Sequence, residues 1–152
     1  MEYIWKDYYD CIIDEDIFLD KEAKELTGID EEGIREFCDY WNQKGKLNKE
    51  HWYKMIYLDN EAIGFIAVGR NNEKYVIMEF IISKYYRSKG YGNKILKELI
   101  NNSNEIINEK IENVEAVIFF RNIASQKCFE KAGFTKELHP EGDCYIYRYK
   151  TQ

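Results

Sequence analysis

The sequence predicts a mixed α/β fold in a single domain, residues 1–152, with helices on the faces of a β-sheet. Two observations predict it. Apolar residues recur at helical spacing within residues 1–50, and beyond residue 50 they form the short runs typical of strands. A chain of 152 residues also fits one domain that buries roughly two thirds of its unfolded surface.

Two helices are predicted ahead of the sheet, at residues 20–27 and 31–43. The second has apolar side chains at helical spacing: Ile34, Phe37, Cys38 and Trp41. Three strands follow, at residues 52–58, 62–69 and 75–83. Because the turn-rich segments LDNEA and GRNNEK separate these strands, we expect an antiparallel meander.

A long helix is predicted after residue 92. Its apolar stripe contains six residues: Ile95, Leu96, Leu99, Ile100, Ile106 and Ile107. The segment VEAVIFF, residues 114–120, is the next strand.

The last part of the chain is predicted to be a helix and a strand pair. The helix covers residues 122–132, with Asn122 as its N-cap and Gly133 as the glycine that ends it. The strands at residues 134–138 and 143–150 complete the mixed sheet.

The cysteines and histidines argue against a metal site. The four cysteines are scattered without C-x-x-C spacing, and only His51 and His139 are available to join them. Scattered cysteines favour a reducing compartment. The opening segment MEYIWKDYYD does not resemble a secretion signal, and no apolar run is long enough to cross a bilayer. We therefore expect a cytoplasmic protein with no membrane partner and no metal.

The charge is unevenly distributed along the chain. Residues 1–50 carry 15 Asp/Glu and 7 Lys/Arg, a net charge of −8, whereas the whole chain carries −6 and the remainder +2. A net negative charge disfavours nucleic acid as a partner. The acidic segment predicts either a binding surface for a cation or simply two solvated helix faces.

The stretch RSKGYGNKIL, residues 87–96, predicts a phosphate-binding turn. Gly90 and Gly92 let the backbone turn sharply and approach a ligand, and the stretch leads directly into the long helix. The first turn of a helix has unpaired N–H groups and the positive end of the helix dipole, which together favour an anion. Neither the dinucleotide fingerprint nor the P-loop matches, because Ile95 replaces a third glycine and no Gly-Lys-Ser/Thr is present.

Two motifs resemble those of the GNAT-type N-acetyltransferases. The block ISKYYRSKGYG, residues 82–92, looks like the family's acyl-CoA signature, and NIASQKCFEKAGF, residues 122–134, resembles its second conserved element. The resemblance covers residues 53–150 and does not extend in detail to residues 1–50. It implies a mostly antiparallel, twisted sheet with helices on both faces and a splayed pair of parallel central strands. Residues 1–50 would then be acceptor-side helices, and residues 51–152 the acyl-CoA-binding core.

The resemblance also implies how acetyl-CoA, the co-substrate, is bound. Its pyrophosphate would be held by backbone N–H groups of the glycine turn: Arg87, Ser88, Lys89, Gly90, Tyr91 and Gly92. Its pantetheine arm would pair with the strand residues Phe80, Ile81 and Ile82, and the N–H near Ile82 would polarise the thioester carbonyl. Three residues of the second motif complete the predicted acetyl-CoA set: Asn122 beside the pantetheine, Phe129 near the sulfur, and Ser125.

Glu79 is the predicted catalytic base. It interrupts the apolar run of residues 76–82, where a carboxylate either reaches water or belongs to a site. An amine must be neutral to attack a thioester, and a partly buried Glu can have its pKa raised toward the working pH. The alternative is an outward-facing side chain on a half-exposed strand. Glu115 is a weaker candidate, expected at an exposed strand start.

One residue departs from the family pattern. Where many members have a tyrosine that protonates the departing thiolate, this chain has Phe129, which cannot donate a proton. Tyr145, Tyr147, Cys128 or water could take that role. Cys128 as a covalent nucleophile is disfavoured, because no histidine lies near it in the sequence.

These observations predict an N-acetyltransferase that moves an acetyl group directly from acetyl-CoA to a primary amine of a small molecule or peptide. The acidic residues 1–50 favour a cationic acceptor. The alternative is a degenerate acyl-CoA-binding or regulatory module without turnover, for which Phe129 is the main argument. A homodimer is an option that the sequence leaves open.

Overall fold

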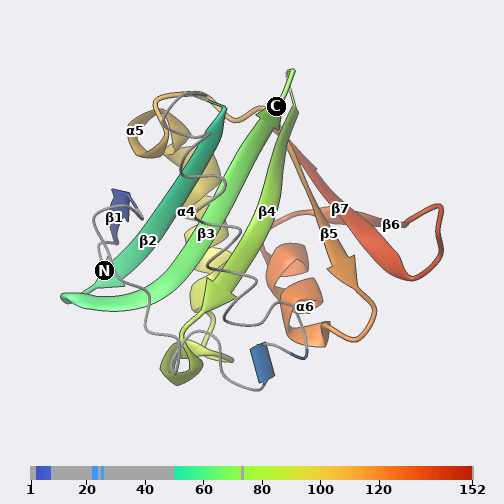
Figure 1. The fold of residues 1–152 in the computed structure, drawn as a ribbon, viewed down its shortest axis with the longest axis horizontal. Helices are drawn as coiled ribbons and strands as arrows, with labels where there is room; N and C mark the ends of the chain where they lie inside the picture. Colours follow the sequence, from blue (N-terminus) through green and yellow to red (C-terminus); the bar gives the residue numbers. More distant parts are fainter. Residues whose placement is uncertain (1–2, 8–21, 24, 26–49, 73, 152) are drawn as a thin grey trace. The chain divides into compact units, whose positions relative to one another are not determined.

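The computed structural model describes residues 3–7, 22–23, 25, 50–72 and 74–151 (Figure 1). The two helices predicted within residues 1–50 lie outside the described residues, apart from Glu22, Ala23 and Glu25, which are helical.

The chain divides into two compact units. The first comprises residues 1–69 and 79–86, and the second comprises residues 70–78 and 87–152. The single domain spanning residues 1–152 stays a prediction.

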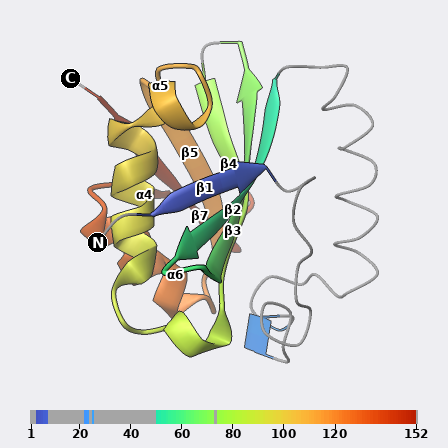
Figure 2. The same ribbon diagram turned by 90° about the vertical axis from the view of Figure 1, so that its left-hand side faces the viewer.

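The first unit contains strands β1 (Ile4–Asp7) and β2 (His51–Leu58) and most of β3 (Glu61–Asn71). Strand β1 pairs antiparallel with β2, and Figure 2 shows the two strands together. Lys54 Nζ lies 2.6 Å from the Asp7 carboxylate across this pair. The sequence did not predict β1, because its four residues are mostly exposed and show no strand periodicity.

Strands β2 and β3 pair antiparallel, as the sequence predicted, and a two-residue turn joins them. Both turn residues, Asp59 and Asn60, have positive φ angles of 51° and 68°, which suits the right-handed twist of a hairpin. Residues 63–69 of β3 are buried without interruption. Such a continuous apolar run is typical of an interior strand that is covered on both faces.

The second unit contains the start of β4 (Lys74–Ile82) together with β5 (Asn113–Phe119), β6 (Thr135–Leu138) and β7 (Cys144–Lys150). Strand β7 pairs antiparallel with both β5 and β6, and Figure 1 shows these three strands side by side. Strand β4 pairs parallel with β5 near the amino-terminal ends of both strands.

The helices of the second unit are α4 (Tyr91–Asn101), α5 (Ser103–Ile106) and α6 (Ile123–Lys131). A 3₁₀ turn, η2 (Lys84–Tyr86), precedes them at the end of the first unit. Helices α4 and α6 pack against each other. The predicted helix 122–132 is confirmed: Asn122 is its N-cap, and Gly133 follows its C-cap with φ of 98°.

The prediction of one continuous helix after residue 92 is wrong. Helix α4 ends at Asn101, and Asn102 has φ of −120° and ψ of 27°, outside the helical region. Asn and Ser side chains compete with the helix for backbone hydrogen bonds, and the break falls at Asn101, Asn102 and Ser103. The six apolar residues of the predicted stripe are nevertheless buried, on two helices and the residue that follows them.

The described strands follow the order β1-β2-β3-β4-β5-β7-β6 in the sheet. This order confirms the predicted fold class, a mixed sheet with a parallel pair, β4 and β5, at its centre. Within the described residues, no helix is long and apolar enough to span a membrane.

Candidate functional site

The glycine turn lies at the amino terminus of α4, as the sequence predicted. Gly90 is the N-cap residue with φ of 85° and ψ of 4°, a left-handed conformation that a Cβ disfavours. Ser88, two residues earlier, also has a positive φ, 60°. The Asn93 side chain donates a hydrogen bond to the Gly90 carbonyl over 3.1 Å, which closes the turn. The turn therefore has a tight backbone conformation with two positive φ angles, at Ser88 and Gly90.

The surroundings of this turn are cationic. Lys89 is exposed and Arg87 half-buried, and Lys94 lies one turn into the helix with its Nζ 5.8 Å from the centre of the Tyr91 ring. The first turn of α4 contains no acidic residue. The positive end of the helix dipole and the nearby cations together favour an anion such as a phosphate.

Asn122, at the start of α6, has a clear structural role. Its side-chain oxygen accepts a hydrogen bond from the Ser125 N–H over 3.2 Å, which caps the helix. The neighbouring Gln126, which sequence reasoning missed, is buried and donates to the carbonyls of Phe119 and Phe120 over 3.0 and 2.9 Å. Gln126 thus fixes α6 against the carboxyl end of β5.

Phe129 is a core residue of the second unit. Only 3% of its surface is exposed, and its ring centre lies 4.9 Å from that of Phe134 and 6.0 Å from that of Tyr147. The second unit therefore contains the glycine turn and the three residues of the second motif that are predicted to bind acetyl-CoA, Asn122, Ser125 and Phe129. Their contact with acetyl-CoA stays a prediction.

Glu79 lies in the first unit, with Phe80, Ile81 and Ile82, near the end of β4. Its side chain is half-buried, and burial raises the pKa of Glu79 from an ordinary 4.5 to about 7, although a hydrogen bond from the Phe80 backbone N–H acts in the opposite direction. A carboxylate with this pKa exchanges protons readily at neutral pH. The pKa of Glu79 therefore suits a general base, and the catalytic role of Glu79 stays a prediction.

The backbone around the end of β4 is held firmly within the first unit. The Ser83 N–H donates to the Ile63 carbonyl over 2.8 Å, directly after the strand. A Cβ added at Gly64 would lie 3.4 Å from Ile82 Cδ1 and 3.5 Å from Ile56 Cδ1, which is ordinary van der Waals contact, so the side chains of Ile82 and Ile56 pack closely over this position. The backbone directly after Ile82 is thus held against β3, and the oxyanion role of Ile82 stays a prediction.

The structure distinguishes the side chains that could replace the missing tyrosine acid. Burial raises the pKa of both Tyr147 and Cys128 to about 12. Groups with such high pKa values give up a proton poorly, and the Cys128 thiol stays protonated at neutral pH. Both residues are therefore poor proton donors, and Cys128 is a poor nucleophile. Tyr145, which is half-buried, and water remain as candidates.

Tyr147 allows a direct test of this conclusion. Its side chain is fully buried, and its hydroxyl has no hydrogen-bond partner among the described residues. We expect Tyr147→Phe to keep turnover within about twofold and to raise the free energy of unfolding by roughly 1 kcal/mol, because an unsatisfied buried hydroxyl is removed. Urea unfolding and steady-state kinetics measure the two effects. A large loss of turnover in a folded variant would show that Tyr147 does act as the acid.

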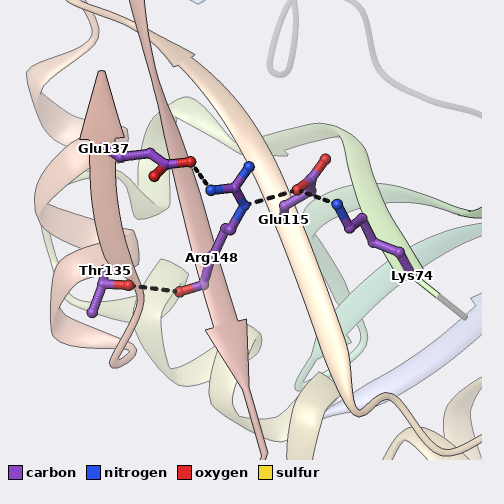
Figure 3. A network of polar contacts seen from close by, with 5 residues as sticks. All are labelled: Lys74, Glu115, Thr135, Glu137 and Arg148. Carbon is purple, nitrogen blue, oxygen red and sulfur yellow. Dashed lines mark hydrogen bonds and ion pairs between the residues drawn. The ribbon is translucent and has the colours of Figure 1, made fainter. Parts of the chain in front are cut away.

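Glu115, the weaker base candidate, belongs to an ion-pair network that crosses four strands. Figure 3 shows its carboxylate between Lys74 Nζ and Arg148 Nε, each 3.2 Å away, and Arg148 also pairs with Glu137. Both cations thus engage the Glu115 carboxylate in ion pairs. Lys74, Glu115 and Arg148 of this network line a hollow of about 610 Å³. Neither Glu79 nor any residue predicted to bind acetyl-CoA lines it. Glu115 is therefore a structural residue.

Comparison with known proteins identifies relatives of the chain. The sequence model of the Acetyltransferase (GNAT) family matches residues 8–134. A probable spermine N(1)-acetyltransferase of Bacillus subtilis subsp. natto is 30% identical over 94 residues, and a spermine/spermidine N(1)-acetyltransferase of Bacillus subtilis is 29% identical. Each of these matches covers 55% of this chain and 60% of the relative.

Solved structures of low sequence identity share the fold. A spermidine N-acetyltransferase from Vibrio cholerae, in complex with CoA and spermine, has a TM-score of 0.72 at 14% identity, over 97% of this chain and 95% of its own. An aminoglycoside acetyltransferase in complex with coenzyme A has a TM-score of 0.72 at 14% identity, over 99% and 96%.

Proposed function

This chain belongs to the GNAT family of acetyltransferases, and on that premise we propose that it transfers an acetyl group from acetyl-CoA directly to a primary amine. The family match over residues 8–134 is the observation that carries the proposal. The names of the similar enzymes support it, since they describe N-acetyltransferases. This chain matches only 60% of the length of each of these Bacillus subtilis relatives. We therefore propose the activity and do not take it over from them.

In the proposed reaction, backbone N–H groups of the turn Arg87 to Gly92 hold the pyrophosphate of acetyl-CoA. Glu79 accepts a proton from the acceptor ammonium, directly or through water. The neutral amine nitrogen attacks the thioester carbon, whose oxygen is stabilised by the N–H near Ile82. The carbon–sulfur bond then breaks, and the thiolate takes up the proton that the nitrogen loses. The raised pKa of Cys128 supports direct transfer without a covalent intermediate.

For the acceptor we propose a cationic small molecule, with polyamines as the first choice. Two of the relatives are named as acetyltransferases of spermine or of spermine and spermidine. The net charge of −8 in residues 1–50 supports attraction of a polycation to this part of the chain. Aminoglycosides and peptide amines are the next candidates.

The test of the activity is release of free coenzyme A thiol by the purified chain. Acetyl-CoA is mixed in turn with spermidine, spermine, an aminoglycoside, a lysine peptide and a neutral-bodied arylamine. We expect turnover with at least one amine and acetylated product in the mass spectrum. Binding of acetyl-CoA without turnover of any amine would instead support the acyl-CoA-binding module.

Ionic strength tests the electrostatic basis of acceptor choice. We expect kcat/KM for spermidine to exceed that for the arylamine at low salt. It should fall several-fold between about 0.01 and 0.5 M salt, because added salt shortens the distance over which opposite charges attract each other. The arylamine serves as the control and should respond weakly. A preference for the arylamine at both salt concentrations, or an unchanged advantage for spermidine, would contradict the proposal.

We also propose that the protein works in the cytoplasm. The support is chemical: Cys128 and Cys144 are free thiols, and unpaired cysteines are typical of a reducing compartment. A homodimer stays a prediction.

A further inference from the structure

The turn between β6 and β7 brings together three side chains that can bind a metal. A ring nitrogen of His139, a carboxylate oxygen of Asp143 and the sulfur of Cys144 lie within 4.8 Å of one another. The sequence argued against a metal site because the cysteines are scattered. Cysteine spacing indicates sites that contain several cysteines. The present cluster has one nitrogen, one oxygen and one sulfur ligand atom, so cysteine spacing does not reveal it.

The backbone of the turn holds these side chains in place. The His139 N–H donates to the Cys144 carbonyl over 2.9 Å, and the Gly142 N–H donates to the His139 carbonyl over 2.8 Å. The register Leu138↔Tyr145 makes His139 and Cys144 the next opposing pair of the hairpin. Side chains of an opposing antiparallel pair lie on the same face, with Cβ atoms roughly 5 Å apart. The side chains of His139 and Cys144 thus lie on the same face of the hairpin without a bound metal.

The donor set and its charge suit zinc. One sulfur, one nitrogen and one oxygen are the ligand atoms that Zn²⁺ takes in proteins, and a site with three protein ligands keeps its fourth position for water. A Cys144 thiolate and the Asp143 carboxylate would together neutralise the two charges of the ion. Tetrahedral zinc at its usual bond lengths sets ligand atoms roughly 3.3 to 3.6 Å apart, so each side chain has to move by only about 1 Å.

The hydrogen bonds of the cluster are compatible with this movement. The Glu141 N–H donates to Nδ1 of His139 over 3.2 Å in an exposed position. A hydrogen bond of this kind contributes only about 1 kcal/mol net, so a metal ion can displace it from the ring nitrogen. The Glu141 carboxylate, close to Cys144, adds further negative charge.

We propose that His139, Asp143 and Cys144 bind one Zn²⁺ ion, which fastens the turn between β6 and β7. This site is independent of the proposed acetyl transfer, because none of its residues belongs to the predicted acetyl-CoA set. The metal would act on the conformation of the hairpin.

The experiment uses Co²⁺ as a spectroscopic substitute for Zn²⁺. The full chain carrying Cys11→Ser, Cys38→Ser and Cys128→Ser keeps Cys144 as its only thiol. Titration with Co²⁺ should produce a thiolate-to-cobalt charge-transfer band that saturates at one equivalent, and added Zn²⁺ should abolish the band. Zn²⁺ should also raise the unfolding temperature, because it binds only the folded turn.

Single ligand changes in the same background identify the site. Cys144→Ser should abolish the band, and His139→Gln and Asp143→Asn should each weaken binding by about tenfold or more. His51→Gln is the matched control and should bind as the parent does. Circular dichroism of the metal-free variants checks that each one folds. Absence of the band in the folded parent, or an unchanged affinity in folded His139→Gln and Asp143→Asn, would overturn the proposal.

Discussion

Gly90→Ala is expected to weaken acetyl-CoA binding by at least about tenfold in a chain that still folds. Gly90 has φ of 85°, a conformation that costs an alanine roughly 1 kcal/mol. The added Cβ meets little inside the protein, since its nearest neighbour is Asn93 Nδ2 at 3.9 Å. A large loss of affinity would therefore come from displaced N–H groups or from contact between the Cβ and the phosphates. Isothermal titration calorimetry measures the affinity.

Gly142 provides a matched control for this experiment. Its φ of 78° is similar, and a Cβ there meets nothing within 4 Å. Gly142→Ala should thus destabilise the fold by a similar roughly 1 kcal/mol and leave acetyl-CoA affinity unchanged. If both variants lose affinity equally, the effect at Gly90 is one of general stability. If neither loses affinity, the glycine turn does not hold the pyrophosphate.

Glu79→Gln is expected to lower kcat by roughly two to four orders of magnitude and to preserve acetyl-CoA affinity. Glutamine keeps the shape of the side chain and removes its basicity. With the pKa of Glu79 near 7, the activity of the parent should rise with pH through that value as the carboxylate ionises. The variant should lack this rising limb. A variant with the parent's rate and pH profile would exclude Glu79 as the base.

The same pKa shift predicts a change in stability with pH. The pKa of Glu79 is higher in the folded chain than its ordinary 4.5, so ionisation of this group opposes folding. Its stabilising contribution is complete below about pH 4.5 and is lost as the pH rises through about 7. Glu79→Gln should therefore gain stability relative to the parent at pH 8 and not at pH 4. Because the side chain is half-buried, the gain should be smaller than the full shift implies.

The sequence predicted most of the described elements, because their signals are local. Alternating and continuous apolar runs marked β2, β3, β4 and β5, and Asn122 and Gly133 marked both ends of α6. The break after α4 was missed because the spacing of apolar residues continues across the break, although polar residues at 101–103 end the helix. Strand β1 was missed because it depends on pairing with β2, a partner more than forty residues away.

The candidate site could be predicted only in part. The positive φ of Gly90 and the shifted pKa of Glu79 agree with expectations drawn from residue types and their neighbours. The cluster around Cys144 lies within one turn, residues 139–144, and was missed because its three ligands are of three different types. The ion pairs of Glu115, in contrast, depend on which strands lie next to each other. Pairing of distant segments is set by the tertiary fold, and no local pattern in one sequence encodes it.

Among the described strands, β6 is the last in the sheet, and this position has a consequence for the solubility of the protein. An outermost strand leaves backbone groups that another chain could pair with, which is a route to aggregation. Strand β6 is only four residues long, all of them exposed, and its two central residues, Lys136 and Glu137, are charged. Lys136 lies over the Tyr145 ring, and Glu137 pairs with Arg148. An approaching strand would have to desolvate both charges, which disfavours pairing of another chain along this border of the sheet.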